Sequence, residues 1–441
     1  MYSNRYVYDA LYGLIHLPDY VWETMLCPEV QRLREVRLCN INSLCLPGGA
    51  NINRYEHAIG TVHLALQCLQ NLHMRVDKVT GKRIVLAALL HDIMSAAFGH
   101  SVQYVLGNRG YEHESVYDIV ESKVPKDQLQ YCYQQSRFQP IFFGMHRRLP
   151  SLLNNADLME IGQIVAGQGT YGPLISSGID LDNIDNVYRL AYHIGLTGTT
   201  RVPIELANSI WSADGRLIID YYAVDLLKDW YQVRRTLYRF LLLNPDEFSA
   251  KCMLQEALEL ASERSEVSFY WHDVDYQLLE KLANSTDEVA IIISRLMVGD
   301  LYGCLGIYST SNTDAYAILS NSQERRKLEM LVESQVRKAG HNLYKKANVG
   351  IHVIKDVNKT ERQVRILTSK GKEITIGTPS SRLLVGVFLK NVHFSMHKIK
   401  ENTLKASGIQ NVVRNVLGDT LVDKDLEEIE PYGESTEAIP N

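Results

Sequence analysis

The stretch Arg83-Ile-Val-Leu-Ala-Ala-Leu-Leu-His-Asp92 joins an apolar helix-forming run to two polar residues of the kind that bind metals. The run has the pattern of a buried helix, so it places His91 and Asp92 beside the protein core. Burying an imidazole next to a carboxylate is unfavourable unless something compensates, and a metal ion is the commonest compensator. The stretch therefore predicts a helical core with a metal site at the end of one helix.

Two other segments offer partners for this pair. His57, in Arg54-Tyr-Glu-His57, begins another helical run, and Asp182 lies at the start of a third predicted helix. Two imidazoles and two carboxylates suit a hard or borderline divalent cation that keeps positions open for water and substrate. We therefore predict four metal ligands, His57, His91, Asp92 and Asp182, with Asp180 and Asp185 as alternative carboxylates. The competing interpretation is a group of core polar residues that satisfy one another.

The composition is typical of a globular protein from a reducing compartment. The 441 residues are 46% hydrophobic, enough for one large domain and a smaller addition. The net charge is −5 without a long Lys/Arg run, so nucleic acid is not indicated as the main partner. Seven cysteines without Cys-x-x-Cys spacing argue against a thiolate zinc site. Because neither a membrane span nor a secretory signal is found, we expect a cytoplasmic protein with no membrane partner.

Helical periodicity dominates the sequence to about Val336. The predicted helical runs are 61–72, 84–97, 187–195, 226–243, 251–261 and 287–301. Beyond residue 349 the pattern changes to short strands, predicted at 350–354, 363–368, 373–377 and 383–389. We therefore predict a mainly α fold with a helical domain over 1–340, a small mixed α/β module over 341–418 and an acidic flexible tail over 419–441.

The ordered motifs Arg54-x-Glu-His57, His91-Asp92 and Gly178-Ile-Asp-x-Asp182 resemble those of the HD-domain metal-dependent phosphohydrolases. The supporting context is found at 27–34, 46–57, 98–100, 113–115 and 188–193. Within that superfamily the chain is most similar to the branch of sterile-alpha-motif/HD deoxynucleoside triphosphate triphosphohydrolases, over roughly residues 1–260. The resemblance implies an HD-domain helical bundle and a homo-oligomer.

The resemblance also assigns roles to individual residues. It makes the four predicted ligands the family's metal ligands. Arg54 matches an arginine that contacts substrate phosphate, and a salt-bridging arginine is the simpler alternative. His100 and His113 match histidines that assist proton transfer, whereas structural histidines are the alternative. Tyr238 matches a substrate-contacting tyrosine on a later helix, and a core tyrosine is the alternative.

Several positions depart from the family pattern. Ser95 replaces an active-site histidine and is a poor proton carrier near neutral pH. Gln103 replaces an aspartate that is expected to orient a catalytic imidazole. The positions that contact sugar and phosphate also differ, at Leu38, Cys39, Asn183, Asn186 and Leu190. We therefore expect no strong preference for deoxynucleotides over ribonucleotides.

Together, these observations predict a metal-dependent phosphohydrolase that acts on a nucleotide or another phosphate ester. Its cofactor is a divalent ion, one of Mn, Mg, Zn, Fe, Co or Ni. Two alternatives stay open. One is a regulatory HD protein that binds a nucleotide or a partner with little hydrolysis, and the other is a phosphodiesterase for cyclic or oligonucleotide substrates.

Overall fold

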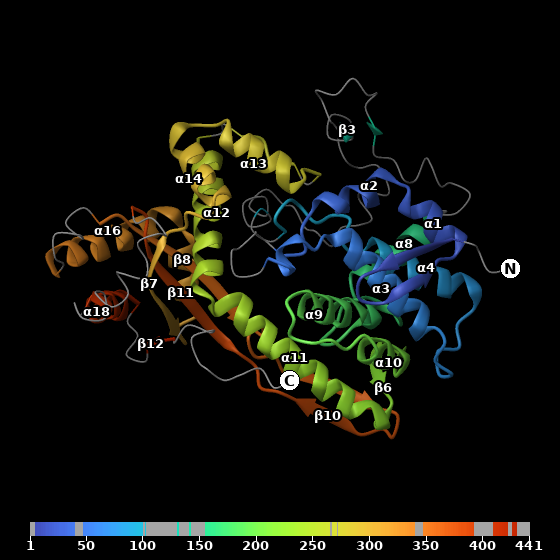
Figure 1. Cartoon of the computed structure of the whole chain (residues 1–441). Coiled ribbons are helices and arrows are strands. Elements are labelled where there is room, and N and C mark those ends of the chain that lie inside the picture. The colour runs from blue at the N-terminus through green and yellow to red at the C-terminus, as the bar shows by residue number, and fades with distance from the viewer. Residues whose placement is uncertain are drawn as a thin grey trace.

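The computed structural model describes residues 5–39, 47–99, 102, 130–131, 141–142, 155–264, 267–270, 272–339, 347–391, 409–421 and 426–429. Helices dominate these residues, and short strands form small sheets beside them (Figure 1). The mainly α class predicted from the sequence is confirmed.

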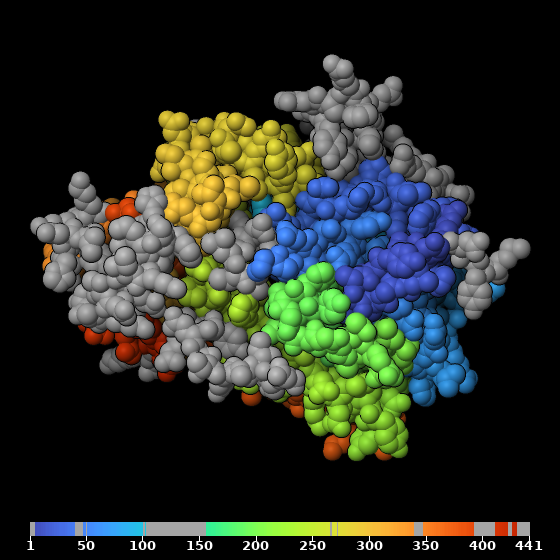
Figure 2. Space-filling model, viewed as in Figure 1, coloured from blue at the N-terminus to red at the C-terminus, as the bar shows by residue number. Residues whose placement is uncertain are grey.

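Helices from the first half of the chain form one packed body. The central helix α3 (Arg54–Cys68) contacts α4 (Lys78–Leu90), α9 (Leu181–His193) and α10 (Val202–Asn208). In turn, α4 contacts α1 (Asp19–Met25) and α8 (Asn155–Val165), and α1 contacts α2 (Pro28–Gln31). In Figure 2 the blue surface of the N-terminal helices continues into the green surface of α9 and α10.

The helix predicted over 84–97 ends earlier than expected. Helix α4 stops at Leu90, and residues 91–94 form a turn. The His91 ring, in which Nδ1 lies 2.8 Å from the carbonyl oxygen of Ala88, caps this end of the helix. This early end places His91 and Asp92 just beyond α4 instead of within it.

A long helix leads from this body to the second half of the chain (Figure 1). Helix α11 (Val224–Leu243) packs on α9, and α12 (Pro245–Glu263) follows after a bend at Asn244. Asn244 caps α12. Pro245 fits the first turn because a backbone N–H at that position would have no partner within the helix. Helix α12 contacts α14 (Asp287–Met297) and α13 (Asp275–Ala283).

The larger of two four-stranded sheets is antiparallel and combines strands from both sides of residue 340. Its order is β12 (Glu427–Glu428), β7 (Gly303–Thr310), β11 (Ser381–Leu389) and β8 (Val349–Val357). The neighbouring helices are α15 (Ala315–Ser320), α16 (Ser322–Ala339) and α18 (Ile409–Leu421). Helix α16 contacts both α18 and β8.

The other four-stranded sheet ties late strands to the helical body. It joins the hairpin of β9 (Val364–Thr368) and β10 (Glu373–Ile376) to the hairpin of β5 (Ile210–Ala213) and β6 (Arg216–Ile219). Strands β6 and β9 pair in parallel, with Ile218 opposite Leu367. Separate two-stranded pairs are formed by β1 (Tyr6–Asp9) with β2 (Gly13–His16) and by β3 (Gln130–Tyr131) with β4 (Ile141–Phe142).

All four strands predicted beyond residue 349 are present as β8, β9, β10 and β11. Two segments differ from the predicted secondary structure, and the domain bounds stay predictions. Strand β7 lies inside the predicted helical domain (1–340), yet it pairs with β11. Within the predicted tail (419–441), residues 419–421 end α18 and Glu427–Glu428 form β12. Short strands are weakly encoded because distant pairing partners decide them, and the rest of that tail lies outside the described residues.

Helix α3 approaches α9 closely at Gly60. A Cβ atom added there would lie 2.0 Å from Oδ2 of Asp185 and 2.1 Å from Nη2 of Arg189. At Gly81 in α4, the nearest atom to an added Cβ is 3.6 Å away. Gly60 therefore sets the distance between the two helices, whereas Gly81 leaves room for a methyl group.

We expect Gly60→Ala to lower the free energy of unfolding by about 1–3 kcal/mol, because overpacking outweighs the better helix propensity of alanine. The matched Gly81→Ala change should raise it by up to about 1 kcal/mol. Urea denaturation of both variants measures the difference. Equal stabilities would contradict the close approach at Gly60.

Candidate metal centre

Three elements bring the predicted metal ligands together. His57 comes from the first turn of α3, His91 and Asp92 follow α4, and Asp182 lies in the first turn of α9. The Nε2 atom of His57 lies 3.1 Å from Nε2 of His91 and 2.9 Å from Oδ1 of Asp182. The Oδ2 atom of Asp92 lies 3.9 Å from Nε2 of His57 and 3.7 Å from Nε2 of His91. All four side chains predicted as ligands therefore meet at one place.

The donor set fits a divalent cation. The Nδ1 atoms of His57 and His91 face oxygen acceptors, on Asp185 at 2.7 Å and on Ala88 at 2.8 Å. With a proton on each Nδ1, the Nε2 lone pairs of the two rings face each other and repel. A cation between the rings would bind both lone pairs. The buried Oδ2 of Asp92 has no hydrogen-bond partner among the described residues. Ligand atoms of His57, His91 and Asp92 all lie within 4.8 Å of one another.

A buried charge network holds His57 in this orientation. The His57 ring faces Asp185, and the fully buried Arg189 donates to both oxygens of Asp185 at 2.9 and 3.0 Å. Arg189 also donates to Asp9 at 2.9 Å and to Glu56 at 2.6 Å. Burial alone would raise the pKa of Asp185, but Arg189 and His57 lower it to about 2. Asp185 is therefore an ionised partner of His57 behind the ligand cluster.

The remaining alternative carboxylate, Asp180, has a different task. It caps α9 by accepting the backbone N–H of Asn183 at 2.7 Å, and it also accepts the backbone N–H of Ser177 at 2.7 Å. Burial and the neighbouring Asp182 raise the pKa of Asp180 to about 7. These contacts turn Asp180 toward the backbone and leave Asp182 as the α9 carboxylate beside the two histidines.

Arg54 and Ser95 both contact Asp92. The Arg54 guanidinium donates to Oδ1 of Asp92 at 2.6 Å, and the Ser95 hydroxyl donates to the same oxygen at 2.8 Å. The salt-bridging interpretation of Arg54 is thus present in the structure, and Arg54 also lines the adjoining cavity. The other positions in this part of the prediction, His100, His113 and Gln103, lie outside the described residues.

The ligand cluster opens onto a cavity of about 430 Å³. Tyr238 lines it, and the guanidinium of Arg234 lies 4.2 Å from the centre of the tyrosine ring. Of the five sugar- and phosphate-contact positions that depart from the family pattern, four also line the cavity, namely Leu38, Cys39, Asn186 and Leu190. The fifth, Asn183, contacts Asp180 and Arg362 instead.

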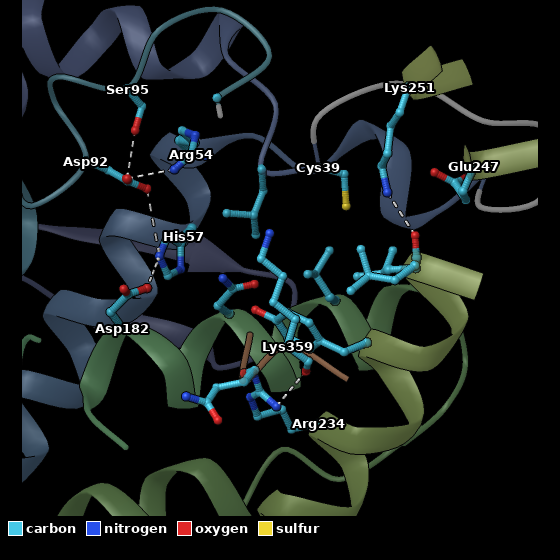
Figure 3. A pocket seen from close by; sticks show the side chains of 18 of the residues that line it. Cys39, Arg54, His57, Asp92, Ser95, Asp182, Arg234, Glu247, Lys251 and Lys359 are labelled. Carbon is cyan, nitrogen blue, oxygen red and sulfur yellow. Dashed lines mark hydrogen bonds and ion pairs between the residues drawn. The ribbon is translucent and has the colours of Figure 1, made fainter. Parts of the chain in front are cut away.

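The cavity also has basic residues that the sequence analysis missed. They are Arg234, Lys251, Lys359 and Arg362. Figure 3 labels the first three. Arg234 donates to the carbonyl oxygens of Lys359 and Asn358, at 3.0 and 3.1 Å, and so fixes the turn after β8. Asn358 has a φ of 54°, a left-handed conformation that asparagine tolerates better than most residues. No local pattern marked these residues, because more than one hundred positions separate Arg234 from the turn that it holds.

The chain is similar to several known proteins. The chain is 24% identical over 261 residues to an uncharacterized protein of Methanocaldococcus jannaschii, covering 58% of this chain and 49% of that protein. It is 25% identical over 123 residues to a deoxynucleoside triphosphate triphosphohydrolase SAMHD1 homolog of Dictyostelium discoideum, covering 26% and 24% respectively. The chain thus spans half or less of the length of these curated relatives.

A solved structure extends the comparison to the fold. A phosphohydrolase from Bacteroides thetaiotaomicron superposes with a TM-score of 0.62 at 16% identity, over 88% of this chain and all of that one. The resemblance to HD-domain phosphohydrolases is confirmed. At this level of identity the structural match shows a shared fold. No protein-family model matches the chain.

Among the described residues, none of the helices combines the length and the apolar character that crossing a bilayer requires.

Replacing Arg189 with methionine tests the charge network. The change would leave Asp185, Asp9 and Glu56 without the cation that they share, so we expect the free energy of unfolding to fall by roughly 3–5 kcal/mol. In the control Arg264→Met, an exposed pair with Glu288 is lost, and the expected fall is less than about 1 kcal/mol. Urea denaturation measures the free energy of unfolding of both variants. An equal fall in both would mean that the buried network of Arg189 stabilises the protein no more than an exposed ion pair does.

Proposed function

We propose that this protein is an HD-domain phosphohydrolase that uses a divalent metal ion to cleave a nucleotide or another phosphate ester. The observation that carries the proposal is that the His/Asp cluster lies in the wall of a cavity that also contains lysine and arginine side chains. Imidazole and carboxylate groups bind a cation, and cationic side chains attract phosphate. The triphosphohydrolase and phosphohydrolase relatives support this combination.

We assign His57, His91, Asp92 and Asp182 as the residues that hold the metal. When bound, the ion supplies a Lewis acid for a phosphoryl oxygen and lowers the pKa of a bound water molecule. Asp185 orients His57, whereas Arg54 and Ser95 orient Asp92. His100 and His113 stay the proposed proton carriers. Arg54, from its place at the cavity wall, also stays the proposed contact to substrate phosphate.

Lys359 provides a second argument for a phosphate substrate. Its ammonium group lines the cavity and donates no hydrogen bond to a described residue. Burial and the nearby charge of Lys251 both lower the pKa of Lys359. An anion beside Lys359 would stabilise the charged form of its ammonium group. A polyphosphate, which carries several charges along its length, meets this requirement better than a neutral ester.

Tyr238 and the segment around β8 to β11 complete the proposed binding site. We propose that Tyr238 contacts the substrate, because its ring lines the cavity. The predicted C-terminal module would then contribute Lys359 and Arg362 to substrate binding. A homo-oligomer and a cytoplasmic location stay predictions.

The regulatory alternative rests on one observation. Ser95, which replaces a family histidine, is committed to Asp92 and offers no proton carrier near neutral pH. A protein of this kind would bind a nucleotide at the metal centre with little release of phosphate. A single assay that measures both binding and phosphate release over a nucleotide panel separates the two functions.

The metal assignment predicts about one transition-metal ion per purified chain, because the donor set is complete within one site. We expect Asp182→Ala to lose the ion while the helical circular dichroism persists. The control Asp180→Asn keeps the helix cap and should keep the ion. Elemental analysis measures both, and full occupancy in Asp182→Ala would show that the ligand set is wrong.

The substrate assignment predicts that Lys359→Met raises the KM for a nucleoside triphosphate about tenfold or more, the loss expected for a charged hydrogen bond. Its metal content should be unchanged. The control Lys372→Met removes an exposed lysine of the same segment, and its KM should stay within about twofold. Phosphate release with Mn²⁺ measures both values, and unaltered kinetics in Lys359→Met would remove this residue from the binding site.

A further inference from the structure

The cavity has a second polar end, away from the metal centre. Glu247 and Lys251 both line the cavity, and they lie four residues apart in the first turns of α12, on one face of the helix. Figure 3 shows these two side chains on the right, whereas His57, Asp92 and Asp182 lie on the left. A ligand held at the metal centre thus has a second pair of charged groups within the same cavity.

Glu247 is a buried acceptor that lacks a donor. Its side chain belongs to a residue that is only 3% exposed, and Oε1 has no hydrogen-bond partner among the described residues. Burial raises the pKa of Glu247 to about 7. A buried carboxylate without donors is unfavourable. An N–H group from a ligand would therefore stabilise its ionised form.

Lys251 is a donor that is only partly used. Its Nζ atom donates to the carbonyl oxygen of Leu241 at 2.8 Å. An ammonium group has three hydrogens to donate, and Lys251 donates no further hydrogen bond to a described residue. Lys251 can therefore bind an acceptor on a ligand beside Glu247.

The cavity wall also carries apolar side chains. They belong to Leu38, Leu190, Leu241, Leu242 and Val357. A planar heterocycle has apolar faces and a polar edge, so it suits such a lining. A sugar or polyol would instead leave hydroxyl groups unpaired against the leucines.

We propose that Glu247 and Lys251 recognise the edge of a nucleobase that carries N–H donors beside a carbonyl group, with guanine preferred. This inference rests on the proposed function, which places the phosphate groups at the other end of the cavity. Glu247 only accepts hydrogen bonds when it is ionised, and Lys251 only donates them. Guanine offers two N–H donors next to a carbonyl oxygen, whereas adenine offers one amino group and no carbonyl.

Calorimetric titration of the full chain with Mn²⁺ and the α,β-imido analogues of GTP and ATP tests this subsite. We expect the GTP analogue to bind at least about tenfold more tightly, since buried polar groups built around a hydrogen-bonding edge reject a ligand that lacks it. Glu247→Gln and Lys251→Met should each reduce that preference to about threefold or less, mainly by weakening binding of the GTP analogue. The control is Glu263→Gln, at the end of the same helix α12. It removes an exposed ion pair with Arg326 of α16 and should keep the full preference.

The result that would overturn the subsite is equal binding of the two analogues by the wild type, or no binding of either. An equal loss of both analogues in Glu247→Gln, accompanied by a lower melting temperature, would also overturn it by showing a structural role. The proposed function can fail separately. Guanine-selective binding without phosphate release would support the subsite and refute hydrolysis. Phosphate release from all nucleotides without base preference would support hydrolysis and refute the subsite.

Discussion

The orientation of His57 depends on the buried ion pairs of the Arg189 guanidinium. This guanidinium contacts three carboxylates, on Asp185, Asp9 and Glu56, while its residue is fully buried. One of these carboxylates fixes the ring of His57. Since an unpaired buried charge is strongly destabilising, the carboxylates and the arginine require one another. The same group explains why α3 carries a glycine where it meets α9, because any side chain there would displace the ion pair.

The cavity beside the metal centre is assembled from distant parts of the chain. His57, Asp92 and Asp182 come from residues before 190, whereas Lys359 and Arg362 follow β8. Arg234, from α11, binds the turn that carries Lys359, and the parallel pairing of β6 with β9 holds the following hairpin against the helical body. The late strands thus complete the cavity instead of forming a separate unit beside it.

The sequence predicted that two histidines and two aspartates meet, because the signals for this are local, and their role as metal ligands stays a prediction. His57, His91, Asp92 and Asp182 each lie at the beginning or the end of a helix, and the helical pattern located those ends to within about seven residues. Its ordered motifs supplied the rest through the family resemblance. By contrast, β7 was missed because its strand character depends on pairing with β11, which follows about seventy residues later.

The cavity residues Lys359 and Glu247 could not be predicted in the same way. Lys359 is an ordinary surface-type residue in its own segment, and Arg234 from the distant helix α11 holds the turn that carries it. Glu247 reads as a favourable acidic residue in the first turn of a helix. Its burial without a donor becomes visible only when α12 is packed. Tertiary packing, rather than local pattern, therefore decides which charges become part of a site.

The parallel pairing of β6 with β9 also has a consequence for the folding of the protein during its synthesis on the ribosome. Ile218 is synthesised long before its partner Leu367, so β6 must wait with an unpaired edge while the intervening chain emerges. The helices that carry the histidines and aspartates are complete by residue 193 and can pack first. A nascent chain therefore acquires its cluster of metal-type ligands well before the lysine and arginine wall closes over it. The cavity that we propose for phosphate is complete only after Lys359 and Arg362 have been made.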